Sequence, residues 1–111
     1  MIRWTVFAFL LISLFGIAVC QAAGLQYETI TVANKTLGFT ASKITAPVSE
    51  AVCTLETAQI RFRVDGTDPT SSEGHLLETG QKWSSVNAVE IGNFKAIRTG
   101  ATSGVLKCSY R

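Results

Sequence analysis

Near its middle the chain reads Gln59-Ile60-Arg61-Phe62-Arg63-Val64-Asp65, in which apolar and polar residues alternate. A period of two places Ile60, Phe62 and Val64 on one face of a β-strand and both arginines on the other face. The same period recurs through most of the chain beyond its first 25 residues, and no window is typical of an amphipathic helix. The pattern therefore predicts an all-β protein.

Short segments with the same alternation lie on both sides of this strand, separated by residues that favour turns. The expected strands are residues 28–32, 37–42, 49–57, 59–65, 75–77, 81–85, 88–91, 94–99 and 105–110. Strands of this number and spacing predict a small antiparallel β-sandwich. The first strand is rich in threonine, and we expect it at a sheet edge.

The first 23 residues have the three parts of a secretory signal peptide. Arg3 supplies the positive charge, residues 6–19 form an apolar run, and small residues close the segment. We expect a signal peptide over residues 1–23, a β-sandwich domain over 24–111, and a secreted or periplasmic location without a transmembrane span in the mature chain. Two alternatives stay open: an uncleaved anchor, for which the run is short, and a lipoprotein attached through Cys20.

Length and charge exclude other classes of protein. The chain has 111 residues, with Lys+Arg 10 and Asp+Glu 8, and loss of Arg3 with the leader leaves nine basic residues (10 − 1). This length allows one domain. The near-neutral balance argues against a nucleic-acid binder, which normally carries a clear basic excess.

Two cysteines remain beyond the leader, Cys53 and Cys108, and alternation places each on the apolar side of its strand. In an oxidising compartment such a pair is expected to form a disulfide. We expect this bond to join the two sheets across the core, with two separate buried thiols as the alternative. Metal binding is disfavoured because the only histidine is His75, at no ligand spacing from either cysteine.

Four basic residues on two of the expected strands are candidates for a binding stripe: Arg61, Arg63, Lys95 and Arg98. If the two strands are neighbours, the stripe could dock an acidic partner, a lipid headgroup or a phosphate. The alternative is a solvated outer face whose charges discourage edge-to-edge pairing of sheets.

Other candidates have a structural alternative as well. Trp83 could stack on a sugar ring, although a lone Trp in a sandwich more often lies in the core. Asp65 and Asp68 could offer oxygens to Ca²⁺, but such a site needs six to eight oxygen ligands, and we expect them to bind the backbone amides of their own turn. We expect no metal and no cofactor. Asn34-Lys35-Thr36 is a glycosylation sequon, which matters only in a eukaryotic secretory pathway.

From Ala58 onward the chain carries an apolar-Arg-aromatic strand, an Asp-Gly-Thr-x-Pro-Thr turn at 65–70 and a Phe-Lys-Ala-Ile-Arg strand at 94–98. This combination resembles the small β-sandwich proteins encoded among the structural genes of tailed phages. The resemblance implies a virion decoration or accessory protein that binds a protein lattice or other copies of itself. The export segment departs from it, because phage virion proteins assemble in the cytoplasm.

The same turn, with Phe94-Lys95-Ala96-Ile97 and Ser103-Gly104-Val105, also resembles the immunoglobulin-like accessory domain of chitobiases and other secreted glycosidases. Together the two resemblances imply an immunoglobulin-like or jelly-roll-like sandwich without catalysis. A single histidine and the absence of a recognised catalytic motif also argue against an enzyme. The expected function is an exported structural or accessory module. The alternative is a secreted module that binds carbohydrate or the cell envelope.

Overall fold

The computed structural model describes residues 25–45 and 48–111, so the expected signal peptide over residues 1–23 lies outside the described residues. The described chain is built mostly of strands: β1 (Gln26–Val32), β2 (Ala51–Glu56), β3 (Ile60–Arg63), β4 (His75–Leu77), β5 (Lys82–Ser85), β6 (Lys95–Arg98) and β7 (Gly104–Tyr110). Two short helices complete it, α2 (Ala41–Ile44) and α3 (Ala88–Asn93).

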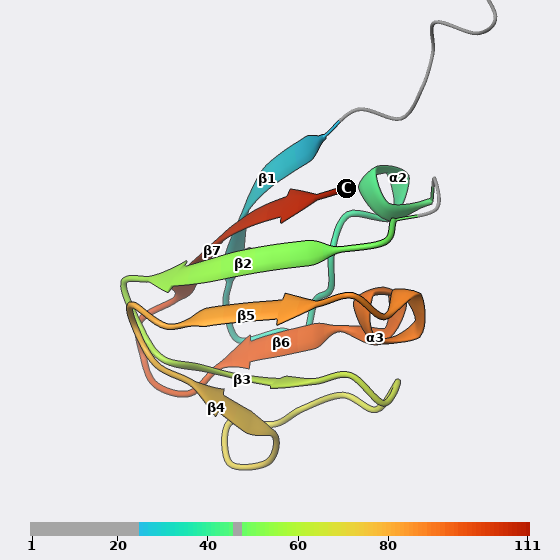
Figure 1. Cartoon of the computed structure of the whole chain (residues 1–111). Helices are drawn as coiled ribbons and strands as arrows, with labels where there is room; N and C mark the ends of the chain where they lie inside the picture. The colour runs from blue at the N-terminus through green and yellow to red at the C-terminus, as the bar shows by residue number, and fades with distance from the viewer. Residues whose placement is uncertain (1–24, 46–47) are drawn as a thin grey trace, which may run out of the picture.

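The strands form two antiparallel sheets, as the alternation predicts (Figure 1). The first sheet has the order β1-β7-β2-β5, and the second has the order β4-β3-β6. β1 lies at the edge of the first sheet, which confirms the expectation for the threonine-rich strand. In the loop that follows β1, Leu37 forms a backbone bridge with Ala96 of β6. This bridge links the loop of the first sheet's edge strand to the second sheet.

The core lies between the sheets and follows the period of two. In β7 the even residues are buried and the odd ones are partly or fully exposed, and β3 buries Ile60 and Phe62 in the same way. Aromatic rings fill the centre: Phe39 stacks on Phe94 with ring centroids 4.4 Å apart, and Phe62 lies 5.4 Å from Phe94. Burial of these large side chains is the main stabilising contribution of the sandwich.

The disulfide between Cys53 and Cys108 is present, as expected, but its place in the fold differs from the prediction. The two cysteines are direct partners in the register of β2 and β7, which are neighbouring strands of one sheet. The expectation that the bond joins the two sheets across the core is therefore wrong. Two inward-facing side chains on adjacent strands satisfy the alternation as well as two on facing sheets do.

Two segments expected as strands contain helices instead. Residues 88–91 belong to α3, because the side chain of Asn87 accepts hydrogen bonds from the amides of Val89 and Glu90 and caps the helix at its start. Of the expected strand 37–42, only Leu37 pairs with a strand, and the chain enters α2 at Ala41.

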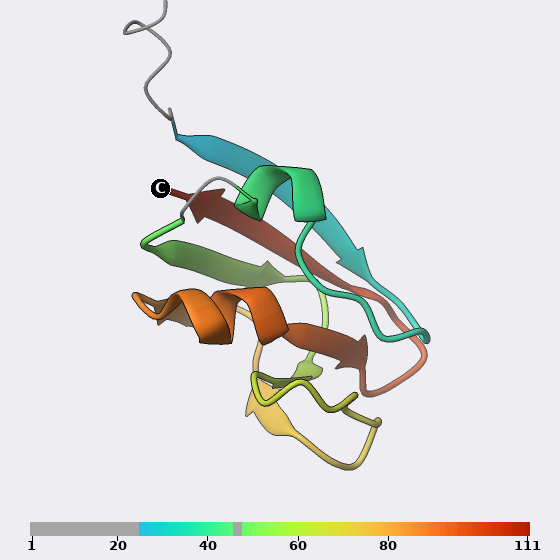
Figure 2. The same cartoon turned by 90° about the vertical axis from the view of Figure 1, so that its right-hand side faces the viewer.

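A buried carboxylate determines the path of the chain before α2. Glu28 of β1 points inward and is 9% exposed. Its carboxylate accepts hydrogen bonds from the amide and hydroxyl of Thr40 and from the hydroxyl of Tyr110. Because the Thr40 amide is bound to this side chain, it cannot join a β-ladder, so the segment crosses the inner side of the first sheet and continues as α2 (Figure 2).

Candidate functional site

The basic residues singled out in the sequence lie on β3 and β6, which are neighbours in the second sheet. Arg63 is opposite Lys95 and Arg61 is opposite Ile97, so Arg61, Arg63 and Lys95 share the outer face of this sheet. Arg98 is opposite the buried Ile60 and therefore belongs to the inner face of the sheet. Three of the four expected residues thus lie on one face.

Arg61 binds the long loop between β3 and β4. Its guanidinium donates to the carbonyl oxygens of Ser71, at 3.2 Å, and Gly74, at 2.8 Å. Pro69 of the same loop is buried. Gly74 has a φ of +136°, and a Cβ there would lie 3.2 Å from Cβ of Pro69, so this tight approach requires glycine. The loop therefore covers part of the basic face.

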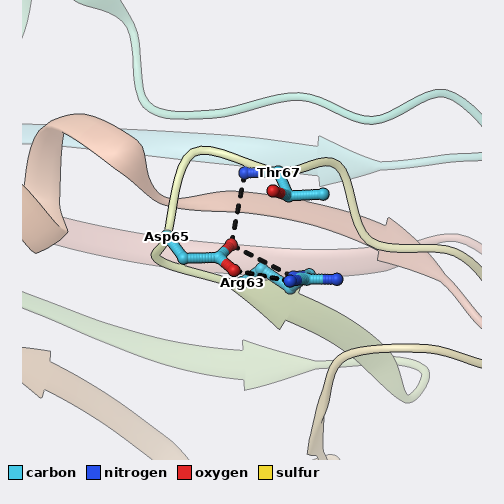
Figure 3. A network of polar contacts seen from close by, with 3 residues as sticks. All are labelled: Arg63, Asp65 and Thr67. Atoms are coloured by element: carbon cyan, nitrogen blue, oxygen red, sulfur yellow. Dashed lines mark hydrogen bonds and ion pairs between the residues drawn. The ribbon is translucent and has the colours of Figure 1, made fainter.

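Arg63 and Asp65 form an ion pair that also shapes the turn (Figure 3). Both oxygens of Asp65 accept from the guanidinium, and Oδ1 also accepts from the amide of Thr67 at 3.2 Å. These hydrogen bonds, that from Arg63 first, lower the pKa of Asp65 to about 2, and the same pairing raises the pKa of Arg63. Asp65 thus has the turn-stabilising contact expected from the sequence.

The second aspartate of the turn has a different partner. Asp68 accepts a hydrogen bond from Nζ of Lys95 at 2.9 Å, and not from a backbone amide of its own turn as expected from the sequence. The two carboxylates that were weak candidates for a metal site are therefore each paired with a separate cation. Within the residues that the structure describes, no three or more His, Cys, Asp or Glu side chains gather in a way that could hold a metal ion.

Two shallow hollows flank this loop. One, of about 280 Å³, is lined by Arg63, Val64, Asp65, Glu73, Gly74 and His75. The other, of about 460 Å³, is lined chiefly by residues 69–71 and 97–100. His75 is exposed, and its ring lies 5.4 Å from that of Phe62. Of the charged groups that line the first hollow, Arg63 and Asp65 bind one another.

Trp83 lies between the sheets at the β5 edge, in register with Cys53. Its ring centroid is 4.7 Å from that of Phe94 and 6.0 Å from that of Phe62, and the side chain is half-buried. Most of the ring is therefore engaged by the aromatic core, as in the structural alternative considered for this residue. A part of it stays accessible at the edge of the sandwich.

Exposed apolar side chains at the start of β1 were not among the residues predicted from the sequence. Leu25 is 73% exposed and Tyr27 is 57% exposed. The sequence contains a signal for this exposure. Tyr27 is an odd number of residues away from Ile30 and Val32, which are buried, so the alternation of a strand directs its side chain outward. Large exposed apolar groups are informative because they are candidates for contact with a partner.

No helix in the described ranges 25–45 and 48–111 is long and apolar enough to cross a membrane. Comparison of the chain with protein-family models, with curated proteins and with solved structures finds no match.

Proposed function

We propose that the protein is an exported, non-catalytic structural or accessory module that works by docking its surfaces onto a larger assembly. In this proposal it resembles a virion decoration or surface-assembly protein, and its sandwich is of an immunoglobulin-like or jelly-roll-like type. Export is part of the proposal, with residues 1–23 as the leader. The buried disulfide supports it, because such bonds form and persist in oxidising compartments.

The observation that carries the proposal is the internal use of the charged groups at the candidate site. Arg61 is bound by carbonyl oxygens of the loop, Arg63 by Asp65, and Lys95 by Asp68. A site for a small charged ligand or for acid–base chemistry needs such groups available to the ligand. Here they shape a loop and a sheet face instead, which favours a role based on shape.

The outer face of the first sheet offers a surface suited to docking. Across its strands, Thr29 is opposite Lys107, which in turn is opposite Thr54. The neighbouring row runs from Tyr27 through Ser109 to Val52. Hydroxyl, aliphatic and aromatic groups lie on this continuous sheet beside three charged residues, Lys107, Lys82 and Glu56. A broad surface of this mixed kind is better suited to a protein or envelope surface than to a small molecule.

A carbohydrate-binding or envelope-associated module is the second candidate. It is favoured by one observation, the part of the Trp83 ring that stays accessible at the β5 edge, since sugars stack on exposed aromatic faces. The extensive contacts of the same ring with Phe94 and Phe62 weigh against this role, because they leave little of the ring for a ligand.

Fractionation of the producing culture, combined with a glycan array, tests the proposal. We expect to find the protein outside the cytoplasm, without residues 1–23, and sedimenting with virion or envelope particles. We expect it to bind no glycan on the array. Binding to a defined glycan that is lost in the Trp83→Phe variant, with the fold preserved, would support the second candidate instead. A protein that stays in the cytoplasm with its leader attached contradicts both.

A further inference from the structure

The outer edge of β1 is unpaired in the described part of the chain. β1 is paired in register with β7 along all seven of its residues and is the last strand of its sheet. Figure 2 shows β1 as the outermost strand of the first sheet, with β7 and β2 on one side of it and α2 drawn in front of it. No strand among residues 25–45 and 48–111 pairs with the edge that points away from β7.

The disulfide-bonded pair identifies which backbone groups lie at this edge. Cys53 and Cys108 have Cα atoms only 4.1 Å apart, which is typical of a non-hydrogen-bonded pair of an antiparallel ladder. The amide and carbonyl of Cys108 therefore point away from β2 and toward β1, where Glu28 is its partner. Even residues of β1 bind β7, and the amides and carbonyls of Tyr27, Thr29 and Thr31 point outward.

This edge lacks the features that normally prevent pairing. β1 contains no proline and no lysine, and its register with β7 is unbroken. Its only charge, Glu28, points inward, and its carboxylate is bound by Thr40 and Tyr110. The other free edges are shorter or partly covered: β4 has three residues, β5 has four, and β6 is bridged by Leu37.

We propose that two copies of this chain pair through their β1 edges in antiparallel orientation, joining two four-stranded sheets into one. This inference rests on the proposed function and names the surface through which the module assembles. In the register that overlaps the whole of β1, Thr29 is opposite itself and Tyr27 is opposite Thr31 of the second copy. The three outward amides of each copy then all find carbonyl partners.

A second copy fits this edge better than an unrelated strand because β1 is self-complementary in that register. Glu28 is opposite Ile30 rather than another carboxylate, so no like charges meet. Tyr27 gains a β-branched neighbour, a favourable cross-strand pair, and the exposed Leu25 is opposite Ala33 of the second copy. Edge pairing buries less area than a standard interface, so the dimer is weak and depends on concentration.

Analytical ultracentrifugation of the exported protein across a wide range of concentration tests the proposal. The wild type should shift from the mass of one chain toward that of two. Thr29→Pro should stay monomeric, because proline removes an outward amide while the hydrogen bonds to β7 remain. Thr29→Ala is the matched control, because it keeps the amide, and it should still dimerise. Circular dichroism and thermal unfolding check that each variant is folded.

A second variant tests the proposal if Thr29→Pro does not fold. Thr29→Glu keeps every backbone group and places its carboxylate opposite Lys107 of its own chain, so the monomer should tolerate it. It brings two carboxylates together at the twofold axis, and it should also stay monomeric at low salt. A wild type that is monomeric at every concentration overturns the proposal, as does dimerisation of folded Thr29→Pro or Thr29→Glu at the wild-type level. Sedimentation with particles is measured separately, so the proposed function is still tested when the dimer fails.

Discussion

Cys53 and Cys108 are partners across two adjacent strands of one sheet, with Cα atoms 4.1 Å apart and both side chains fully buried. The bond closes a stretch of chain 55 residues long, yet it joins β2 to β7 rather than one sheet to the other. The two sheets are therefore held together by the packing of their inner faces and by the backbone bridge between Leu37 and Ala96. The covalent bond restricts the conformations of the unfolded chain and holds together β2 and β7, the two central strands of the first sheet.

Removal of the disulfide should strongly destabilise the protein. In the chain-entropy treatment, a loop of this length contributes about 4 kcal/mol to the free energy of unfolding. We expect the Cys53→Ala/Cys108→Ala variant to lose about that amount in urea denaturation, and reduction of the wild type under the same conditions to give a similar loss. A double variant as stable as the oxidised wild type would show that the bond does not constrain the unfolded chain.

Glu28 should make stability depend on pH in the acidic range. Burial alone would raise its pKa, but hydrogen bonds from Thr40 and Tyr110 outweigh burial, and the pKa in the folded protein is lowered. Its stabilising contribution is therefore complete above the unfolded pKa of about 4.3 and is lost as the pH falls through the lower folded value. Urea denaturation between neutral pH and pH about 3 should show a steeper loss for the wild type than for Glu28→Gln.

Tyr110→Phe is the control for this effect. It removes one of the donors to the Glu28 carboxylate, so the pKa of Glu28 should be lowered less and the acid-dependent loss should be smaller than in the wild type. We also expect about 1–3 kcal/mol of destabilisation at neutral pH, as for a lost hydrogen bond to a buried charged group. Parallel pH profiles for the wild type, Glu28→Gln and Tyr110→Phe would exclude Glu28 as the source of the dependence.

Local alternation was sufficient to predict most of the strands and the inward direction of both cysteines. It could not predict which strands are neighbours, because pairing is decided by contacts between residues far apart in the sequence. The place of the Cys53–Cys108 bond is one consequence. The closure of the long loop over Arg61 is another, since it depends on carbonyl oxygens 10 and 13 residues away.

Two errors could have been avoided with the sequence alone. Asn87 followed by Glu90 three residues later is a signal for the start of a helix. It is stronger evidence than the alternation over the four residues 88–91, from which a strand was predicted. Lys95 and Arg98 are three residues apart, so a strand directs them to opposite faces, and they could not both belong to one basic stripe. The bond between Thr40 and Glu28, by contrast, has no local signal.

Trp83 and Tyr27 should respond differently to truncation. Trp83 packs against Phe39, Phe62 and Phe94, so Trp83→Ala should cost about 3 kcal/mol or more of unfolding free energy. Tyr27 is 57% exposed, and Tyr27→Ala should change the stability of the monomer by about 0.5 kcal/mol or less, measured by urea denaturation at low protein concentration. A nearly neutral Trp83→Ala would favour a ligand-binding role for that ring.

Gly104 should not tolerate a methyl group, whereas Gly100 should. At Gly104, where β7 begins, a Cβ would lie 2.6 Å from Cγ2 of Ile60 and 2.7 Å from the carbonyl oxygen of Ala58. The carbonyl cannot move without shifting the backbone, so Gly104→Ala should lose about 1–3 kcal/mol through overpacking. A Cβ at Gly100 meets nothing within 4 Å, so Gly100→Ala should change stability by about 0.5 kcal/mol or less. Thermal and urea unfolding compare the two variants, and equal stability of both would contradict the close approach of β7 to the start of β3.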